Sequence, residues 1–283
     1  TDIAAINKII DDNGLQLTKA NPADGSYVPG DWTGVVIWGG GTPKKVQELI
    51  INEKDLTGVL DLTGLTSLVN LNCRDNRLTG LNYSGLTSLE SLSCANNQLT
   101  GTLDLSAQTS LTELNCYNNR LTGLNLTGLT SLTSLYCNNN QLTGTLNLSD
   151  AHSFRYFRCC YNYLTGVNLH SSAPCEKVDV TYNCMANTGN VTGPAITWDT
   201  SPNSNHRFTP QWTQVTFSAA QEGGSSGAAD STAIQLTFSE SVTYLQRSDI
   251  IITDGTGKVT YGDPNGSGTT WTIPLTAVVL EGD

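Results

Sequence analysis

The chain has 283 residues, 38% of them hydrophobic, which is enough for two or three domains with packed cores. Its net charge of −11 argues against binding to nucleic acid, because contact with phosphates needs clustered Lys and Arg. A charged fraction of only 14%, beside abundant Thr, Ser, Asn and Gly, predicts an extracellular or cell-surface protein rather than a cytosolic enzyme.

We expect residues 1–45 to form an N-terminal cap. Asp2 is placed to cap a helix that ends at Gly14. The apolar residues of this helix recur at helical spacing: Ile3, Ile6, Ile9 and Ile10. Three residues between Gly-rich turns are expected to cover the open edge of whatever follows: Trp32, Val36 and Trp38.

The pattern LxxLxCxxNxL repeats through residues 46–190. Plain copies begin at Leu68, Leu89, Leu111 and Leu132, and weaker copies begin at Val46, Phe154 and Cys175. The steps between them alternate between 22 and 21 residues, because every second copy carries one extra residue: Val59, Thr102 and Thr145. Such repeats bury their apolar side only by stacking, so we predict a leucine-rich-repeat solenoid of seven coils with a parallel β-sheet and non-helical return segments.

Two positions of the repeat have structural roles. Position nine falls where each strand turns away, and its amide can bond backbone groups of its own and the neighbouring coil: Asn76, Asn97, Asn119, Asn140, Asn162 and Asn183. Position six points inward, which predicts a buried ladder of small apolar thiols: Cys73, Cys94, Cys116, Cys137 and Cys159.

Neither metal nor disulfides are expected from this ladder. Ligands on successive parallel strands form a row rather than a tetrahedron, and in-register strands hold their Cβ atoms about 4.8 Å apart, farther than a disulfide prefers. The remaining cysteines are Cys160, Cys175 and Cys184, with Cys160 expected on the solvent-facing side of its strand. We therefore expect free thiols.

The outward positions of the strands are expected to form a concave binding face. Early coils place small or charged residues there, such as Asn70, Ser91 and Ala95. Later coils place residue types that are enriched at binding hot spots: Tyr117, Tyr136, Tyr156 and Arg158, with Tyr161 and Tyr182 one step further along. These six residues are the predicted binding patch, although bulky polar residues can also simply decorate such a face.

Residues 191–211 read as a cap or linker and residues 212–283 as a second, all-β module. Apolar residues alternate there with period two. They are Val215 and Phe217; Ile234, Leu236 and Phe238; Ile250 and Ile252; Val259 and Tyr261; and Trp271, Ile273 and Leu275. The stretches STAIQLTFSESV and GTTWTIPLT resemble bacterial immunoglobulin-like domains, which implies a β-sandwich. The turn signature at Glu281–Asp283 leads us to expect a further strand after it.

The repeat length, the Asn position and the short return segments resemble the internalin-like group of bacterial cell-surface leucine-rich-repeat proteins. The resemblance covers Val46 to Thr188, and the lack of cysteines before Cys73 separates it from plant-type repeats. It implies a non-enzymatic, secreted or surface-displayed adhesion protein that binds a protein or glycan.

No catalytic or cofactor chemistry is predicted. His152, His170 and His206 occupy unrelated coil positions, and the repeat geometry places no nucleophile beside them. Turn aspartates at Asp249, Asp254 and Asp263 could hold Ca²⁺, but such residues are typical turn formers, so no metal and no cofactor is expected.

Two alternatives to adhesion stay open. The chain could be a structural stalk or envelope component without a specific ligand, or the targeting portion of a longer exported enzyme. Sequence following Asp283 would discriminate between them, since repeated sandwiches favour adhesion and a catalytic domain favours targeting.

Overall fold

The computed structural model describes residues 2–21, 28–40, 44–199, 204–209, 211, 217–223, 232–242, 245, 250 and 257–280. The chain divides into two compact units, Thr1–Trp212 and Thr213–Asp283, which are described separately. Val215, Asp249, Ile252, Asp254 and the segment Glu281–Asp283, all named above, lie outside the described residues. No helix in the described part has the length and apolar character needed to cross a membrane.

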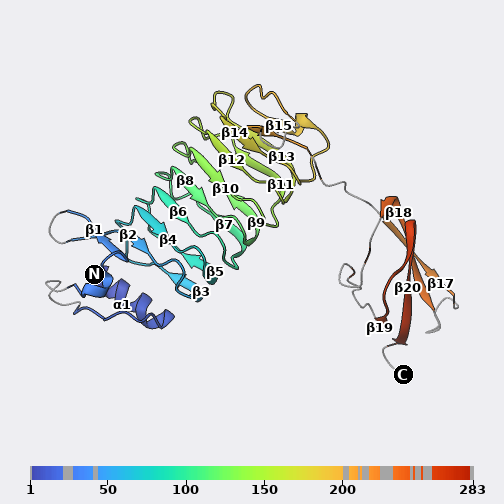
Figure 1. Cartoon of the computed structure of the whole chain (residues 1–283), viewed down its shortest axis with the longest axis horizontal. Coiled ribbons are helices and arrows are strands. Elements are labelled where there is room, and N and C mark those ends of the chain that lie inside the picture. Colours follow the sequence, from blue (N-terminus) through green and yellow to red (C-terminus); the bar gives the residue numbers. More distant parts are fainter. Residues whose placement is uncertain are drawn as a thin grey trace. The chain divides into compact units, whose positions relative to one another are not determined.

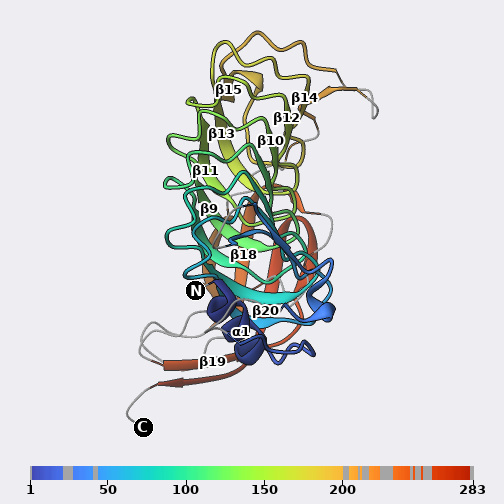
Figure 2. The same ribbon diagram turned by 90° about the vertical axis from the view of Figure 1, so that its left-hand side faces the viewer.

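The first unit is a β-solenoid whose coils stack one behind the other (Figures 1 and 2). One long sheet follows the leading part of every coil. Its nine strands, in spatial order, are β1 (Val36–Trp38), β2 (Val46–Ile50), β4 (Asn70–Asn72), β6 (Ser91–Ser93), β8 (Glu113–Asn115), β10 (Ser134–Tyr136), β12 (Tyr156–Arg158), β14 (Lys177–Asp179) and β16 (His206–Arg207). From β2 onward all neighbours are parallel and in register, so the residues of one coil position form rows along the solenoid.

Short ladders follow the return segments on the other side of the coils. They are β3 (Thr57–Asp61) with β5 (Arg77–Asn82), β7 (Thr100–Asp104) with β9 (Arg120–Asn125), and β11 (Thr143–Leu148) with β13 (Tyr163–Leu169) and β15 (Val191–Thr192). The register of each ladder shifts beside the extra residue, Val59, Thr102 or Thr145. The residue left unpaired there lies on the partner strand: Thr79, Thr122 or Thr165. Gly123 pairs with Thr102, and a Cβ at Gly123 would come within 2.8 Å of Thr102 Oγ1, so a larger residue there would displace the threonine side chain.

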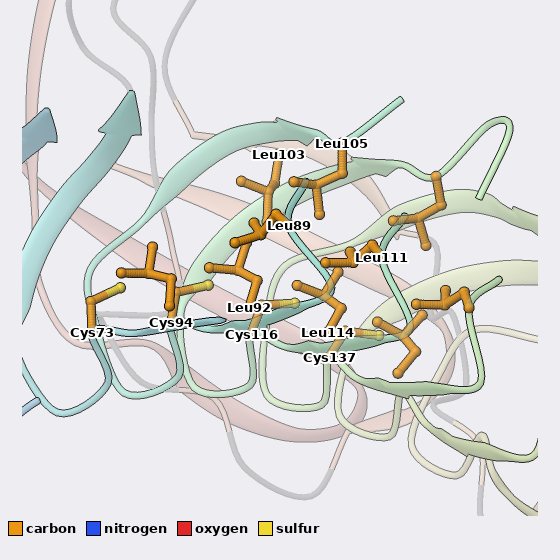
Figure 3. Close-up of a cluster of buried hydrophobic side chains, with 14 of the residues drawn as sticks. Cys73, Leu89, Leu92, Cys94, Leu103, Leu105, Leu111, Leu114, Cys116 and Cys137 are labelled. Carbon is orange, nitrogen blue, oxygen red and sulfur yellow. The ribbon is translucent and has the colours of Figure 1, made fainter. Parts of the chain in front are cut away.

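Between the two sides lies a continuous apolar core. The repeat leucines and the position-six cysteines are almost all less than 3% exposed. Figure 3 shows the thiols of Cys73, Cys94, Cys116 and Cys137 in a row, together with leucines from the coils of Cys94 and Cys116. The predicted solenoid of seven coils is therefore confirmed.

The asparagines at position nine connect consecutive coils through their side chains. Asn119 is representative: Leu99 N donates to its Oδ1 at 2.9 Å, and its Nδ2 donates to Cys94 O and Cys116 O, both at 3.1 Å. All six are at most 9% exposed. Each amide thus serves backbone groups that the turning chain cannot pair within a ladder.

The N-terminal cap consists of helix α1 (Asp2–Asn13), a 3₁₀ turn (Gly30–Trp32) and β1, which pairs antiparallel with β2 and covers its edge. The carboxylate of Asp2 does more than begin the helix. It accepts hydrogen bonds from Lys45 Nζ and Val46 N, both at 2.9 Å, and so attaches α1 to the first coil. Trp32 is fully buried and stacks on Trp38, with 6.3 Å between ring centroids.

Two outward assignments from the alternation are wrong. Ala95 is fully buried and Cys160 is only 6% exposed, although both were expected to face solvent. The strands are three residues long and end at position five, and the residue at position eight has positive φ in every one of these coils, for example 53° at Asn96. The alternation of inward and outward side chains therefore ends before position seven, and the small side chains at that position are buried.

All eight cysteines are free, and seven of them are buried. Burial raises the pKa of Cys94 to about 12 and of Cys160 to about 11. A thiol reacts as its thiolate, so at pH 8 a group with a pKa near 11 is reactive in only about one molecule in a thousand.

We expect one thiol, the half-buried Cys184, to react promptly with a disulfide reagent in the native protein at pH 8. All eight should react once the chain is unfolded without reductant. Mass spectrometry of the labelled peptides checks both counts. Fewer than eight reactive thiols in the unfolded chain would mean that a disulfide forms.

The second unit contains a four-stranded antiparallel sheet with the order β17 (Phe217–Glu222), β18 (Ala233–Val242), β20 (Asn265–Leu280), β19 (Gly257–Tyr261). The predicted strands around Leu236, Tyr261 and Trp271 are thus present. Leu236, Trp271 and Ile273 are its buried core. The described residues of this unit contain no second facing sheet, so its immunoglobulin-like identity stays a prediction.

Candidate functional site

The outer face of the nine-stranded sheet, called the sheet face below, carries the predicted binding patch. The in-register rows bring Tyr136 beside Arg158 and place Tyr156 on the same strand as Arg158. Tyr161 and Tyr182 lie at position eight of their coils, just beyond the strands. Tyr117 lies two coils before Cys160, at the same position seven. The six residues therefore form two groups and one separate residue, Tyr117. The first group is Tyr136, Tyr156 and Arg158, and the second is Tyr161 and Tyr182.

The first group lines a small hollow of about 120 Å³ on the sheet face. Its lining residues are Tyr136, Tyr156, Phe157, Arg158, Lys177 and Asp179. Ligand sites for small molecules usually measure about 300 Å³ or more. The hollow is therefore suited to a single side chain or one protruding group of a larger partner.

Asp179 organises the charges at one end of this hollow. Its side chain is 4% exposed, and Oδ2 pairs with Arg207 at 3.2 Å and with Arg158 at 3.8 Å. Its other oxygen, Oδ1, accepts hydrogen bonds from the backbone N–H and the hydroxyl of Thr181. The carboxylate thereby fixes two guanidinium groups that come from β12 and β16.

Tyr156 is held at the opposite end. Its hydroxyl donates to Glu176 Oε2 at 2.8 Å, and Glu176 also pairs with Arg155. The hydrogen bond from Tyr156 is the main cause that lowers the pKa of Glu176, and the same bond raises the pKa of Tyr156. Tyr156 remains 39% exposed, so its ring is oriented yet available.

The second group is a stacked pair. The rings of Tyr161 and Tyr182 lie 4.3 Å apart between centroids and 10° from parallel. Both residues have positive φ, 57° and 54°. The preceding coils fill this position with a hydrogen-bonded row of short polar residues that tolerate such a backbone: Asp75, Asn96, Asn118 and Asn139. Two bulky aromatic residues here strain the backbone, and such outliers are a reason to look for function.

Cys160 stands between Arg158 and Tyr161 in the sequence, but it is only 6% exposed, so its thiol is not part of the exposed surface of the patch. Burial is the main cause that raises the pKa of this thiol, and the negative charge of Asp179 adds to it.

Sequence reasoning missed Lys177, Asp179 and Arg207. The first two occupy positions three and five of the last coil, so the same register extended by one coil would have found them. Arg207 lies on β16, which follows a stretch without repeat signal, and nothing in the sequence places it next to Asp179.

One histidine expectation needs correction. His170 Nδ1 lies 2.8 Å from Ser172 Oγ, so a hydroxyl is adjacent to it after all. The same nitrogen accepts the backbone N–H of Ser172 at 3.1 Å, which marks a local turn. His152 contacts the His170 ring, with 4.1 Å between centroids. In the described part of the chain, no three His, Cys, Asp or Glu side chains converge into a possible metal cluster.

Comparison with known proteins gives one family match, which supports the repeat assignment for a single coil. A model of the Leucine Rich Repeat family matches residues 110–132, about one coil. No curated protein matches the chain. Among solved structures, a pollen receptor kinase 3 shares 18% identity over 69% of this chain and 98% of that chain, with a TM-score of 0.48. The functional domain of InlJ from Listeria monocytogenes, described as including a cysteine ladder, shares 26% identity over 49% of this chain and 40% of that chain, with a TM-score of 0.36.

The first unit is thus a β-solenoid, one coil of which matches the Leucine Rich Repeat model. Leucine-rich repeats in general are typically non-catalytic and commonly present a protein-binding surface.

Proposed function

We propose that this leucine-rich-repeat solenoid is the recognition part of a secreted or surface-displayed bacterial adhesion protein. Its sheet face binds a protein or glycan on another cell through the residues from Tyr117 to Tyr182. The observation that carries the proposal is the group of tyrosine and arginine side chains around the 120 Å³ hollow.

The arrangement of these side chains supports a binding role. Tyr and Arg supply large, rigid contact area with polar ends, and they dominate binding hot spots. Here hydrogen bonds and ion pairs already orient Tyr156 and Arg158, which lowers the entropy lost on binding. Leading coils offer Asn70, Ser91 and Ser93 at the equivalent positions, so the anchoring residues are concentrated in one half of the sheet.

The cell-surface location is supported by composition. The low charged fraction of 14% and the abundance of small polar residues are typical of extracellular proteins. The free thiols indicate the kind of environment rather than cell-surface display itself, because thiols outside the cell persist where oxygen is scarce.

We expect binding of the purified chain to arrays of host-cell ectodomains and glycans to weaken at least tenfold in the double variant Tyr136→Ala, Tyr156→Ala. Removing two rings from the hollow takes away its main contact area. Tyr163→Ala is the matched control, because Tyr163 is 54% exposed but lies on β13, away from the sheet face. Surface plasmon resonance with each captured ligand gives the affinities.

A second pair of variants tests the stacked tyrosines. Tyr161→Asn and Tyr182→Asn restore the residue that three preceding coils carry at positive φ, so both should fold. Ligands that bind equally well to all sheet-face variants and the control would overturn the proposal and favour a stalk without a specific ligand.

A further inference from the structure

Along the first six coils, the return strands of the solenoid are joined in pairs, and β15 adds a third strand to the last pair. β3 pairs with β5, β7 with β9, and β11 with β13, so that each coil with an extra residue is joined to the next coil. No ladder joins β5 to β7 or β9 to β11 in the described strands. The solenoid therefore has two equivalent gaps on this side, one between its second and third coils and one between its fourth and fifth.

A side-chain hydrogen bond crosses the second gap. Asp150 Oδ2 accepts a hydrogen bond from Gly128 N at 2.8 Å, which ties the turn after β9 to the turn after β11. The inward positions beside this bond carry Leu126 and Ala151, and both are buried in the core. The hydrogen bond of Asp150, called the clamp below, thus lies beside apolar side chains that belong to the regular core.

The first gap differs at all three of these positions. Ala107 stands where the second gap has Asp150, so the clamp cannot form. Tyr83 replaces Leu126, and Gln108 replaces Ala151. The result is a hollow of about 360 Å³ at the ends of β5 and β7. Its lining residues are Leu81, Asn82, Tyr83, Ser84, Gly85, Asp104, Ser106, Ala107 and Gln108.

Gln108 is unusual for its environment. It is 2% exposed in a position that holds Leu65, Leu86 or Leu129 in other coils, and its Oε1 has no hydrogen-bond partner among the described residues. Buried amides are normally paired. Gln108 lines the hollow, but its Oε1 exposes almost no surface, so a ligand reaches this oxygen only when the amide turns toward the hollow. A ligand that donates a hydrogen bond would then pair it.

The other walls restrict the chemistry of such a ligand. Tyr83 is half-buried, and its hydroxyl donates to Asp104 O at 2.8 Å across the gap, which presents a fixed ring. Hydrogen bonds from Ser106 and Asn125 lower the pKa of Asp104, so this carboxylate is ionised at neutral pH. None of the lining residues is cationic. Anions are therefore disfavoured, whereas a neutral molecule with many hydroxyl groups and one flat apolar face meets every wall.

We propose that the gap between β5 and β7 is a second binding site that takes one neutral pyranose ring, either as a free sugar or as the terminal unit of a glycan. The hollow has the volume of a small-ligand site, unlike the one on the sheet face. The acceptors are Asp104 and Gln108, the hydroxyl partner is Ser106, and the ring of Tyr83 packs against the sugar's apolar face. This site lies on the return side and does not depend on the adhesion proposal.

The test uses the whole chain and four named probes: D-glucose, D-galactose, D-mannose and N-acetyl-D-glucosamine. Saturation-transfer NMR should detect binding of at least one of them. Tyr83→Leu and Gln108→Leu give the coils the residue that equivalent positions already carry, so both variants should fold, and each should weaken binding at least tenfold. Ala107→Asp, which recreates the clamp of the second gap, should weaken it as well.

Matched comparisons make the outcome decisive. Asp150→Ala opens the second gap without supplying a tyrosine or glutamine, and it should leave sugar affinity unchanged. Oligosaccharides that end in the bound sugar identify the source: tighter binding than the free sugar indicates a glycan, and binding of the free sugar alone indicates a soluble ligand. The proposal is overturned if none of the sugars or oligosaccharides binds, or if binding survives in both Tyr83→Leu and Gln108→Leu.

Discussion

Replacement of Asn119 by Ala is expected to destabilise the solenoid by about 2–4 kcal/mol, because it strips several buried backbone groups of a partner at once. The amide serves Leu99 N, Cys94 O, Cys116 O and Tyr117 O, which belong to three segments of two adjacent coils. An alanine methyl group pairs with none of them, and at 9% exposure water reaches the site poorly.

Asn118→Gly is the matched control for this prediction. Asn118 is adjacent in sequence and also bonds its neighbours in the preceding and following coils, but it does so on the exposed surface. Glycine accepts its φ of 53°, so the expected loss is below about 1 kcal/mol. Urea unfolding followed by circular dichroism measures both variants. Equal losses would mean that position nine contributes no more than a surface turn.

The order of the coils could be predicted because the repeat constrains every level of structure together. A step of 21 or 22 residues brings Leu71, Leu92 and Leu114 into one row, and the row appears in the register of β4, β6 and β8. The extra residue of alternate coils was visible as an insertion, and the register of the return ladder shifts beside it. The repeat did not reveal that alternate ladders remain unjoined, since that depends on how each return strand meets the next coil.

The second unit shows where such reasoning ends. Period-two alternation located the strands, but this unit has no repeat that would show which residues of neighbouring strands pair with each other. It gave no sign that β20 extends over 16 residues and pairs first with β18 and then with β19. Strand pairing between distant segments depends on tertiary contacts that local alternation does not encode.

The binding patch was predictable in part for the same reason. Tyr136, Tyr156 and Arg158 follow from the register and are brought together by the structure. The outward assignment of Cys160 failed because strand alternation was extended past the end of a three-residue strand. Arg207 could not be found, because the chain returns to the sheet through a segment without period.

The second large loss of stability is expected from a change at Asp179, which pairs with Arg207. Asp179→Ala is expected to destabilise the first unit by about 2–4 kcal/mol. The change removes a carboxylate that is 4% exposed and leaves the guanidinium groups of Arg158 and Arg207 side by side without a counter-charge. It also removes two hydrogen bonds from Thr181.

The loss should be concentrated at the last strand of the sheet. β16 has two residues, and it pairs with β14 through Val178 with His206 and Asp179 with Arg207. An isolated bridge between Asp199 and Arg207 is its other pairing among the described residues. Loosening β16 frees Val180 N, which donates to Arg207 O at 3.0 Å. We therefore expect faster hydrogen exchange at Val180 in Asp179→Ala, together with a lower urea midpoint, and a smaller loss in Asp179→Asn, which can keep the bonds from Thr181.

Glu176→Ala provides the control, because Glu176 is an exposed carboxylate on the same coil that pairs with Arg155 and Tyr156. Exposed ion pairs contribute little to stability, so its urea midpoint should stay close to that of the parent chain. If Asp179→Ala behaved like this control, the ion pairs of Asp179 would not be what holds β16 to the solenoid. If it behaves as expected, one buried carboxylate both closes the last coil and fixes Arg158 in the hollow, so that the stability of the solenoid's end and the geometry of its binding surface depend on the same residue.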